Sequence, residues 1–178
     1  MKCILTLCTW QKMIINRIID GLYRIEDFIP QVTMDYVNSL INETNDWKIQ
    51  TLQEDSPRRS KDGHHPIILK PFQKIVDELN YDYLCDGYTI WRDTEGFKMH
   101  LHEDNLSFCA ACQIYLPGST DGSKGTSFEL KNGEMYEFPF EANTGYFMDN
   151  KERIRHGCPT PVQPGATRLS LYVRYQAK

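Results

Sequence analysis

The sequence contains no stretch that approaches the roughly 20 consecutive apolar residues that a membrane-spanning helix requires. The apolar stretch at residues 3–10 is interrupted by threonines and is followed at once by Gln11 and Lys12. No small-residue cleavage site of the kind that ends a signal peptide comes after it. We therefore expect a cytoplasmic chain without a membrane anchor. Residues 1–20 are assigned to a leader of uncertain role, and Met13 is an alternative start.

The sequence also lacks an excess of basic residues. Its 20 lysines and arginines are outnumbered by 24 aspartates and glutamates, which gives a net charge of −4. Proteins that bind the nucleic-acid backbone depend on Lys and Arg side chains that neutralise phosphates. Nucleic acid is therefore a less favoured partner than a peptide, a protein or a small molecule.

A disulfide framework is absent as well. The six cysteines follow no framework spacing, and a chain of 178 residues can bury a core without such cross-links. We expect free thiols in a reducing compartment. The length suits one domain, which we place at residues 21–178.

Apolar periodicity divides the chain into an early helical part and a later β-rich part. Apolar residues recur at helical spacing over residues 31–42 and 66–79, which predicts two helices. Short alternating or apolar segments bounded by Gly, Asn, Asp or Pro predict strands at 23–28, 47–52, 88–92, 97–102, 108–116, 126–130, 135–138, 145–149 and 167–175. The polar segments 54–65 and 117–125 are expected to be loops. This order predicts an α+β domain with a jelly-roll core that the N-terminal helices buttress.

Two histidines and an aspartate form the most informative pattern. His102 and Asp104 are two positions apart at the end of a predicted strand, so both side chains can face the same side. His156 lies near the start of a later strand-like stretch. Two His and one carboxylate make the facial triad of non-haem Fe(II) oxygenases, which leaves coordination positions open for a co-substrate and O₂. We therefore select His102, Asp104 and His156 as metal ligands.

An arginine and a serine follow the second histidine. Arg168 lies twelve positions after His156, and Ser170 shares its face of the last apolar strand. A guanidinium can bind a carboxylate through two parallel hydrogen bonds, and the hydroxyl adds a third group. This pair is therefore our candidate anchor for a carboxylate co-substrate.

Together these residues resemble the 2-oxoglutarate- and Fe(II)-dependent oxygenases, nearest to the prolyl-4-hydroxylase-like branch. The resemblance covers about residues 88–175 and rests on the order of Gly96, Phe97, His102, Asp104, Gln113, Tyr115, Leu116, Gly125, Phe128, His156, Arg168 and Ser170. It implies a double-stranded β-helix (jelly roll) that binds Fe(II), 2-oxoglutarate and O₂, with ascorbate as a stimulant. It also implies that Tyr115 joins Arg168 and Ser170 in holding the distal carboxylate of 2-oxoglutarate. No catalytic residue beyond the metal ligands is implied.

The substrate is the least constrained part of this interpretation. The resemblance favours a prolyl residue of a peptide or protein. Two positions depart from the branch: Arg168 stands where many prolyl-4-hydroxylases have Lys, and Met99 stands where a tyrosine is expected. Basic residues at 58, 59 and 61, and Arg174 six positions after Arg168, keep a nucleic-acid demethylase as an alternative. A hydroxylase of free amino acids and a cupin-like metal-binding module without oxygenase activity are the others.

Overall fold

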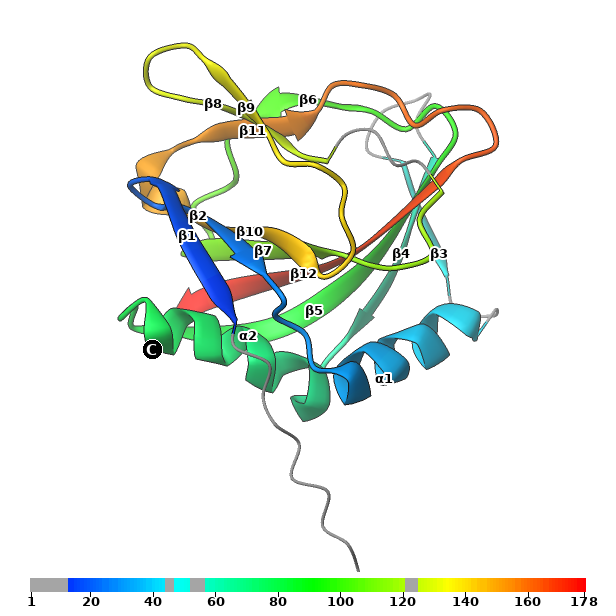
Figure 1. Cartoon of the computed structure of the whole chain (residues 1–178), viewed down its shortest axis with the longest axis horizontal. Helices are drawn as coiled ribbons and strands as arrows, with labels where there is room; N and C mark the ends of the chain where they lie inside the picture. Colours follow the sequence, from blue (N-terminus) through cyan, green and yellow to red (C-terminus); the bar gives the residue numbers. More distant parts are fainter. Residues whose placement is uncertain (1–12, 44–46, 52–56, 121–124) are drawn as a thin grey trace, which may run out of the picture.

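Two antiparallel sheets, two α-helices and a short 3-10 helix (Asn150–Glu152) occur in the part of the chain that the computed structural model describes, residues 13–43, 47–51, 57–120 and 125–178. The large sheet has the order β1 (Ile14–Ile19), β2 (Leu22–Glu26), β10 (Thr144–Asp149), β7 (Ala110–Tyr115), β12 (Thr167–Ala177), β5 (Tyr83–Thr94), β4 (Pro57–Gly63) and β3 (Lys48–Thr51). The small sheet has the order β6 (Met99–His102), β11 (Arg155–Cys158), β8 (Ser127–Glu129) and β9 (Met135–Glu137). The helices lie below the large sheet and the small sheet lies above it (Figure 1). The expected α+β jelly roll is confirmed.

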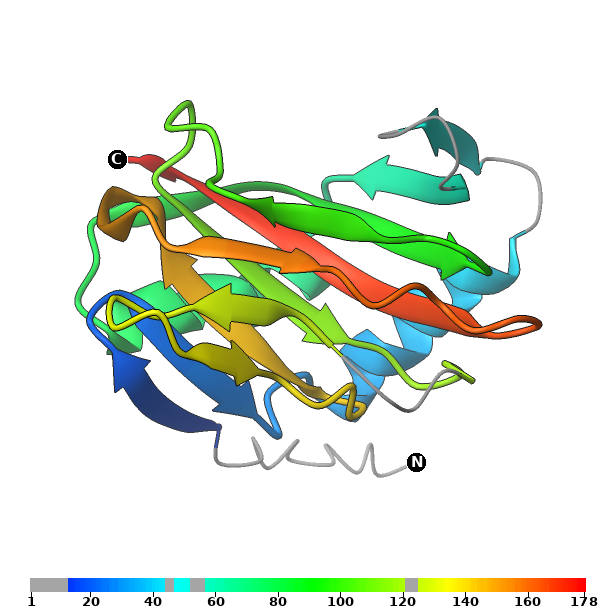
Figure 2. The same ribbon diagram turned by 90° about the horizontal axis from the view of Figure 1, so that it is seen from above.

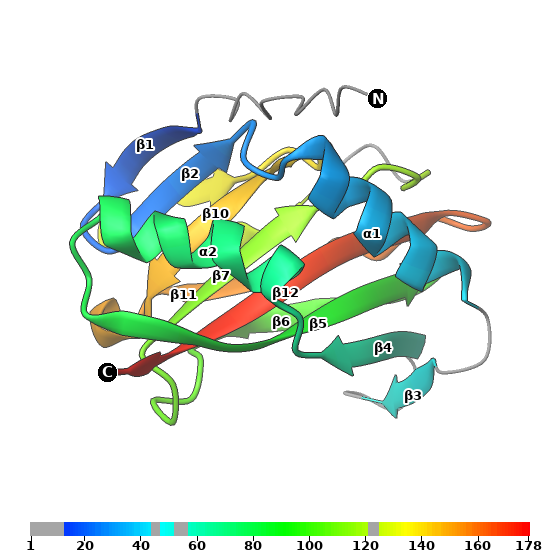
Figure 3. The same ribbon diagram turned by 90° about the horizontal axis from the view of Figure 1, so that it is seen from below.

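The two helices form where the apolar spacing predicts them. α1 spans Gln31–Asn42 and buries Met34, Val37 and Ile41 at positions that share one helix face. α2 spans Pro66–Glu78, one residue shorter than expected, with proline at its first turn, where a missing N–H costs nothing. Both cross the outer face of the large sheet (Figure 3). Neither of these helices is long and apolar enough to cross a membrane.

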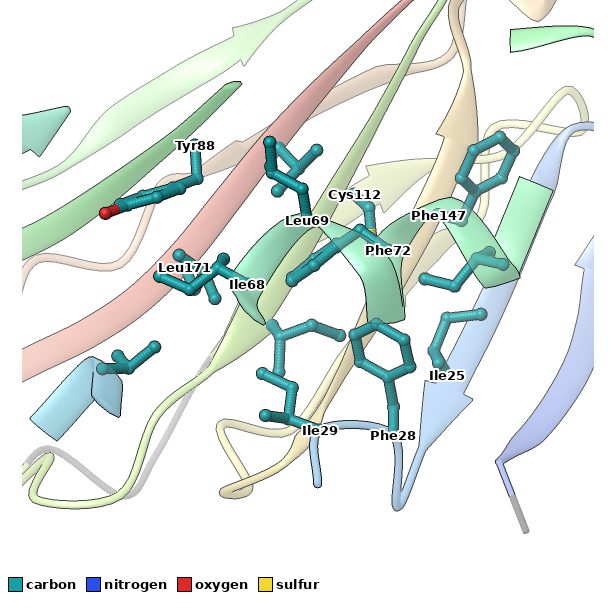
Figure 4. Packing of buried hydrophobic residues seen from close by; sticks show 14 of the residues in the cluster. Ile25, Phe28, Ile29, Ile68, Leu69, Phe72, Tyr88, Cys112, Phe147 and Leu171 are labelled. Carbon is teal, nitrogen blue, oxygen red and sulfur yellow. The ribbon is translucent and has the colours of Figure 1, made fainter. Parts of the chain in front are cut away.

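The main hydrophobic core lies between the helices and the large sheet (Figure 4). Phe72 of α2 is fully buried there and meets Phe28 edge to face, with ring centroids 4.9 Å apart. Leu171 of β12 and Phe147 of β10 point toward the same cluster from the sheet. Because the two helices pack against its outer face, the large sheet can hold functional side chains in place on its inner face.

The inner face of the large sheet is covered by the small sheet, which Figure 2 shows from above. Side chains alternate along β12, so Leu169, Leu171 and Val173 join the helix-side core while Arg168 and Ser170 face inward. Arg168 and Ser170 are nonetheless buried. The space between the sheets is therefore lined with both apolar and polar side chains.

One expected loop is a strand. The polar segment 54–65 was predicted to be a loop, but residues 57–63 form β4, which pairs with β5 from Arg58 to Gly63. The sequence of β4 does not alternate between apolar and polar residues, because its inward positions hold Arg58 and Ser60, which are buried although polar. The carboxylate of Asp93, on β5, pairs with the buried guanidinium of Arg58 and compensates its charge.

Three further observations refine the expected elements. Within the segment assigned to a leader, residues 14–19 form β1 and pair with β2, while residues 1–12 lie outside the described part. Residues 155–158 form β11. Cys85, Cys109, Cys112 and Cys158 are free thiols, as expected, and Cys3 and Cys8 lie outside the described residues.

Candidate metal and co-substrate site

The two candidate histidines face each other across the small sheet. His102 ends β6, His156 lies in β11, and the two are directly paired in the antiparallel ladder. Gly157 allows this approach, because a Cβ at that position would lie 2.7 Å from the backbone oxygens of Met99 and His100. The local sequence of β11 therefore brings His156 to a residue 54 positions earlier in the chain.

Asp104 completes the cluster from the loop after β6. Its Oδ1 atom lies 3.6 Å from Nε2 of His102 and 3.7 Å from Nε2 of His156. One ligand atom from each of the three residues lies within 4.8 Å of the other two. The three sequence-predicted ligands are thus close enough to share one ion.

Hydrogen bonds to the backbone orient both imidazoles. Nδ1 of His102 lies 3.0 Å from the carbonyl oxygen of His100, and Nδ1 of His156 lies 3.3 Å from that of Ile154. Donation from Nδ1 leaves Nε2 as the basic nitrogen, directed at Asp104. Metal-binding histidines commonly hold their second ring nitrogen in this way.

The protonation tendencies of the two histidines differ. The hydrogen bond to Asp104 raises the pKa of His102, whereas burial lowers the pKa of His156. Burial favours the neutral imidazole, which is the form that binds a metal. His156 is 4% exposed at its side chain and His102 is 38% exposed, so the site opens on the His102 side.

The carboxylate of Asp104 fits a metal ligand. Its Oδ2 atom is buried and accepts no hydrogen bond from the described residues. A buried carboxylate oxygen without a donor is costly unless a cation compensates it. The Asp104 carboxylate and the two Nε2 atoms beside it form a donor set that suits Fe(II).

The three candidate anchor residues share the inner face of the large sheet. Ser170 of β12 is directly opposite Tyr115 of β7, and Arg168 lies two residues before Ser170. All three are at most 3% exposed. The structure therefore brings Arg168, Ser170 and Tyr115 to one buried region.

Hydrogen bonds fix the anchor side chains, and sequence reasoning missed their partners. The Tyr115 hydroxyl donates to Oγ1 of Thr126 at 3.1 Å and accepts from the Thr126 N–H at 2.8 Å. Ser170 Oγ accepts from Gln113 Nε2, whose amide oxygen accepts from Tyr146, both at 2.8 Å. Alternation could have found Gln113, which lies two residues before Tyr115 on the same face.

A row of charged residues runs beside these groups. Arg58 of β4, Asp93 of β5 and Arg168 of β12 occupy adjacent register positions, with Asp93 in the middle. Arg58 forms a bidentate pair with Asp93, at 2.5 Å for Nε–Oδ1 and 2.9 Å for Nη2–Oδ2. Its guanidinium also lies over the rings of Trp91 and Phe97, 4.5 and 4.1 Å from their centroids. The row buries two guanidiniums beside one carboxylate.

Two further residues lie on the strands that carry His102 and Arg168. His100 is exposed, and its backbone oxygen is what contacts His102. Arg174 is also exposed, with its guanidinium 6.0 Å from the ring centroid of Phe108. Between Arg168 and Arg174, Tyr172 faces inward, where burial and then the charge of Asp104 raise its pKa. Tyr172 is thus near enough to Asp104 for the charge of that carboxylate to act on it.

Comparison with known proteins places the fold. No protein-family model and no curated protein sequence matches the chain. A prolyl-4-hydroxylase from Pseudomonas putida superposes with a TM-score of 0.66 at 11% identity, covering 89% of this chain and 93% of that one. A prolyl hydroxylase from Trichoplax adhaerens, in complex with a hypoxia inducible factor peptide fragment, gives 0.64 at 12% identity over 88% and 83%. HygX from Streptomyces hygroscopicus, with nickel, 2-oxoglutarate and hygromycin B bound, gives 0.63 at 11% over 89% and 83%. The chain has the jelly-roll fold that these 2-oxoglutarate–Fe(II) oxygenases share.

Proposed function

We propose that this protein is an Fe(II)- and 2-oxoglutarate-dependent oxygenase. The observation that carries the proposal is the convergence of His102, Asp104 and His156, with a buried Asp104 oxygen that accepts no hydrogen bond from the described residues. These residues would hold the iron, and the open side at His102 would admit the reactants. Bound iron and co-substrate supply the oxidising chemistry, which transfers one oxygen atom of O₂ to a substrate C–H bond and the other to 2-oxoglutarate, giving succinate and CO₂.

The co-substrate would be held by Arg168, Ser170 and Tyr115. The buried row of Arg58, Asp93 and Arg168 carries two positive charges and one negative charge. Asp93 already forms a bidentate pair with Arg58. The guanidinium of Arg168, buried on the same inner face, would bind the distal carboxylate of 2-oxoglutarate.

The protein's own groups would orient the reactants and exclude water. The hydrogen bonds of Tyr115 to Thr126 and of Ser170 to Gln113 would hold both side chains in place beside the co-substrate. Phe128 stacks on His156, with ring centroids 5.6 Å apart, and closes the inner side of that ligand. With that side closed, the substrate would approach the iron from the open side at His102.

For the substrate, we favour a prolyl residue in a peptide or protein. Prolyl hydroxylases occur among the structural neighbours, and the Trichoplax enzyme holds a peptide. The basic segment that favoured nucleic acid is not a loop: Arg58 is buried against Asp93, and Lys61 contacts Glu43. A small-molecule substrate is the second candidate, because HygX holds hygromycin B.

Two measurements test the proposal in order. Anaerobic titration with Fe(II) and 2-oxoglutarate should give the weak visible charge-transfer band of the chelate, which a cupin-like module without a co-substrate site would not give. Succinate release with product mass should then be followed across proline-rich peptides, free amino acids and methylated oligonucleotides. A gain of one oxygen on proline supports the prolyl substrate. Turnover with methylated bases alone, with formaldehyde released, would refute it and leave the iron and 2-oxoglutarate assignments standing.

A further inference from the structure

The outer face of the large sheet carries a pair of arginines directly opposite each other. Arg59 of β4 pairs in register with Arg92 of β5, which in turn lies opposite Leu169 of β12. Leu169 belongs to the helix-side core, so this row lies on the face opposite to Arg58 and Asp93. The row is therefore separate from the proposed iron and 2-oxoglutarate site.

These arginines border an open groove of about 470 Å³. Its other walls include the paired residues Thr94 and Thr167, and also Thr120. The backbone N–H of Thr167 donates to Oγ1 of Thr120 at 2.8 Å, which fixes the loop after β7 against the start of β12. The groove thus combines two cationic side chains with the hydroxyl groups of three threonines.

Among the described residues that line the groove, both charged side chains are cationic. No carboxylate of the described residues forms an ion pair with Arg59 or Arg92. Arg92 stacks on Trp47 at 4.3 Å and lies 3.5 Å from the carbonyl oxygen of Ile41, while Arg59 is exposed. Like charges that face each other directly across strands are destabilising. Burial, followed by the charge of Arg59, lowers the pKa of Arg92.

We propose that this groove is a binding site for a phosphate-sized oxyanion with two negative charges, held between Arg59 and Arg92. Two guanidiniums provide paired donors for such an anion, and the neighbouring threonines provide further hydroxyls. An anion between them also removes the repulsion of the facing arginines. The proposal does not depend on the oxygenase assignment, because none of these side chains lies on the inner face.

The test is a titration of the metal-free protein with inorganic phosphate at about pH 8 and constant ionic strength set by chloride. Binding is followed by calorimetry and by amide shifts of Thr94 and Thr167. The wild type should bind phosphate saturably, and Arg59→Gln and Arg92→Gln should each weaken binding at least tenfold. Arg17→Gln removes the same charge from the exposed surface of β1 and should leave the affinity unchanged.

The variants distinguish phosphate that binds in this groove from phosphate that binds at Arg168 on the inner face. Arg168 is intact in every variant, so phosphate bound there would persist in Arg59→Gln. Arg59 is exposed, and that variant should keep the wild-type melting temperature or exceed it without phosphate. A parallel titration with glycerol phosphate distinguishes a phosphorylated metabolite, which should bind more tightly, from free phosphate. Unchanged phosphate affinity in Arg59→Gln, or no saturable binding by the wild type, would overturn the proposal.

Discussion

Arg58 and Asp93 form a bidentate ion pair across β4 and β5, with side chains that are each 6% exposed. Removing one partner leaves a buried charge without compensation, which typically costs about 3–5 kcal/mol. We expect Asp93→Asn to lower the free energy of unfolding by about that amount in urea denaturation. The double variant Arg58→Met/Asp93→Leu should be more stable than Asp93→Asn, because it also removes the Arg58 charge that Asp93→Asn leaves without its partner.

An exposed ion pair offers the matched control for that prediction. Lys131 and Glu152 lie 3.0 Å apart at the surface, and the lysine side chain is 72% exposed. Solvent screening limits such pairs to about 0–1 kcal/mol, so Lys131→Gln should change stability by no more than that. Equal losses in Lys131→Gln and Asp93→Asn would show that the buried pair has no special role.

The second prediction concerns the co-substrate anchor. Arg168→Ala should weaken 2-oxoglutarate binding by about 2–5 kcal/mol, which is about 30-fold to several thousand-fold in Kd. The reason is that the distal carboxylate would lose its charged partner in a buried site. The Kd is measured anaerobically with Fe(II) and without substrate, so that turnover does not enter.

Arg174 gives the control on the same strand face, six residues further along β12. It is exposed and lies beyond Tyr172, so Arg174→Ala should leave the Kd for 2-oxoglutarate within about twofold of the wild type. A larger effect of Arg174→Ala than of Arg168→Ala would move the anchor to Arg174.

The third prediction isolates the Tyr115 hydroxyl. Tyr115→Phe removes an acceptor from the buried N–H of Thr126 as well as one donor. An unsatisfied buried group costs about 1–3 kcal/mol, so we expect the variant to be less stable by that amount in thermal unfolding. Its affinity for 2-oxoglutarate should fall by less than in Arg168→Ala, by about 1 kcal/mol for one hydrogen bond. Thr126→Val, which keeps the N–H, should produce the smaller stability loss of the two.

The sequence predicted those parts of the fold and site that depend on local spacing. The helical spacing of apolar residues such as Val37 and Ile41 predicted α1, and the i, i+2 relation correctly placed Arg168 and Ser170 on one face of β12. β4 was missed because the inward Arg58 looks like a loop residue until Asp93, 35 residues away, is seen beside it. Thr126, the partner of Tyr115, was missed for a similar reason, because alternation within a strand does not predict a contact with a residue outside that strand.

The last prediction concerns the metal ligands. An ion that binds only the folded state raises stability by RT ln(1 + [L]/Kd), which is about 2.7 kcal/mol at a concentration of 100 times Kd. Anaerobic Fe(II) should therefore raise the Tm of the wild type, and a chelator should reverse the shift. His102→Ala and Asp104→Ala should lose both the shift and 2-oxoglutarate turnover, because each removes one of three ligand atoms that lie within 4.8 Å of one another. Without metal, His102→Ala should retain nearly the wild-type Tm, since that side chain is 38% exposed.

His100→Ala is the matched control: His100 is exposed and contacts His102 through its backbone oxygen, which the substitution keeps. A full Fe(II)-induced shift in His102→Ala, or its loss in His100→Ala, would show that the neighbouring histidine is the ligand.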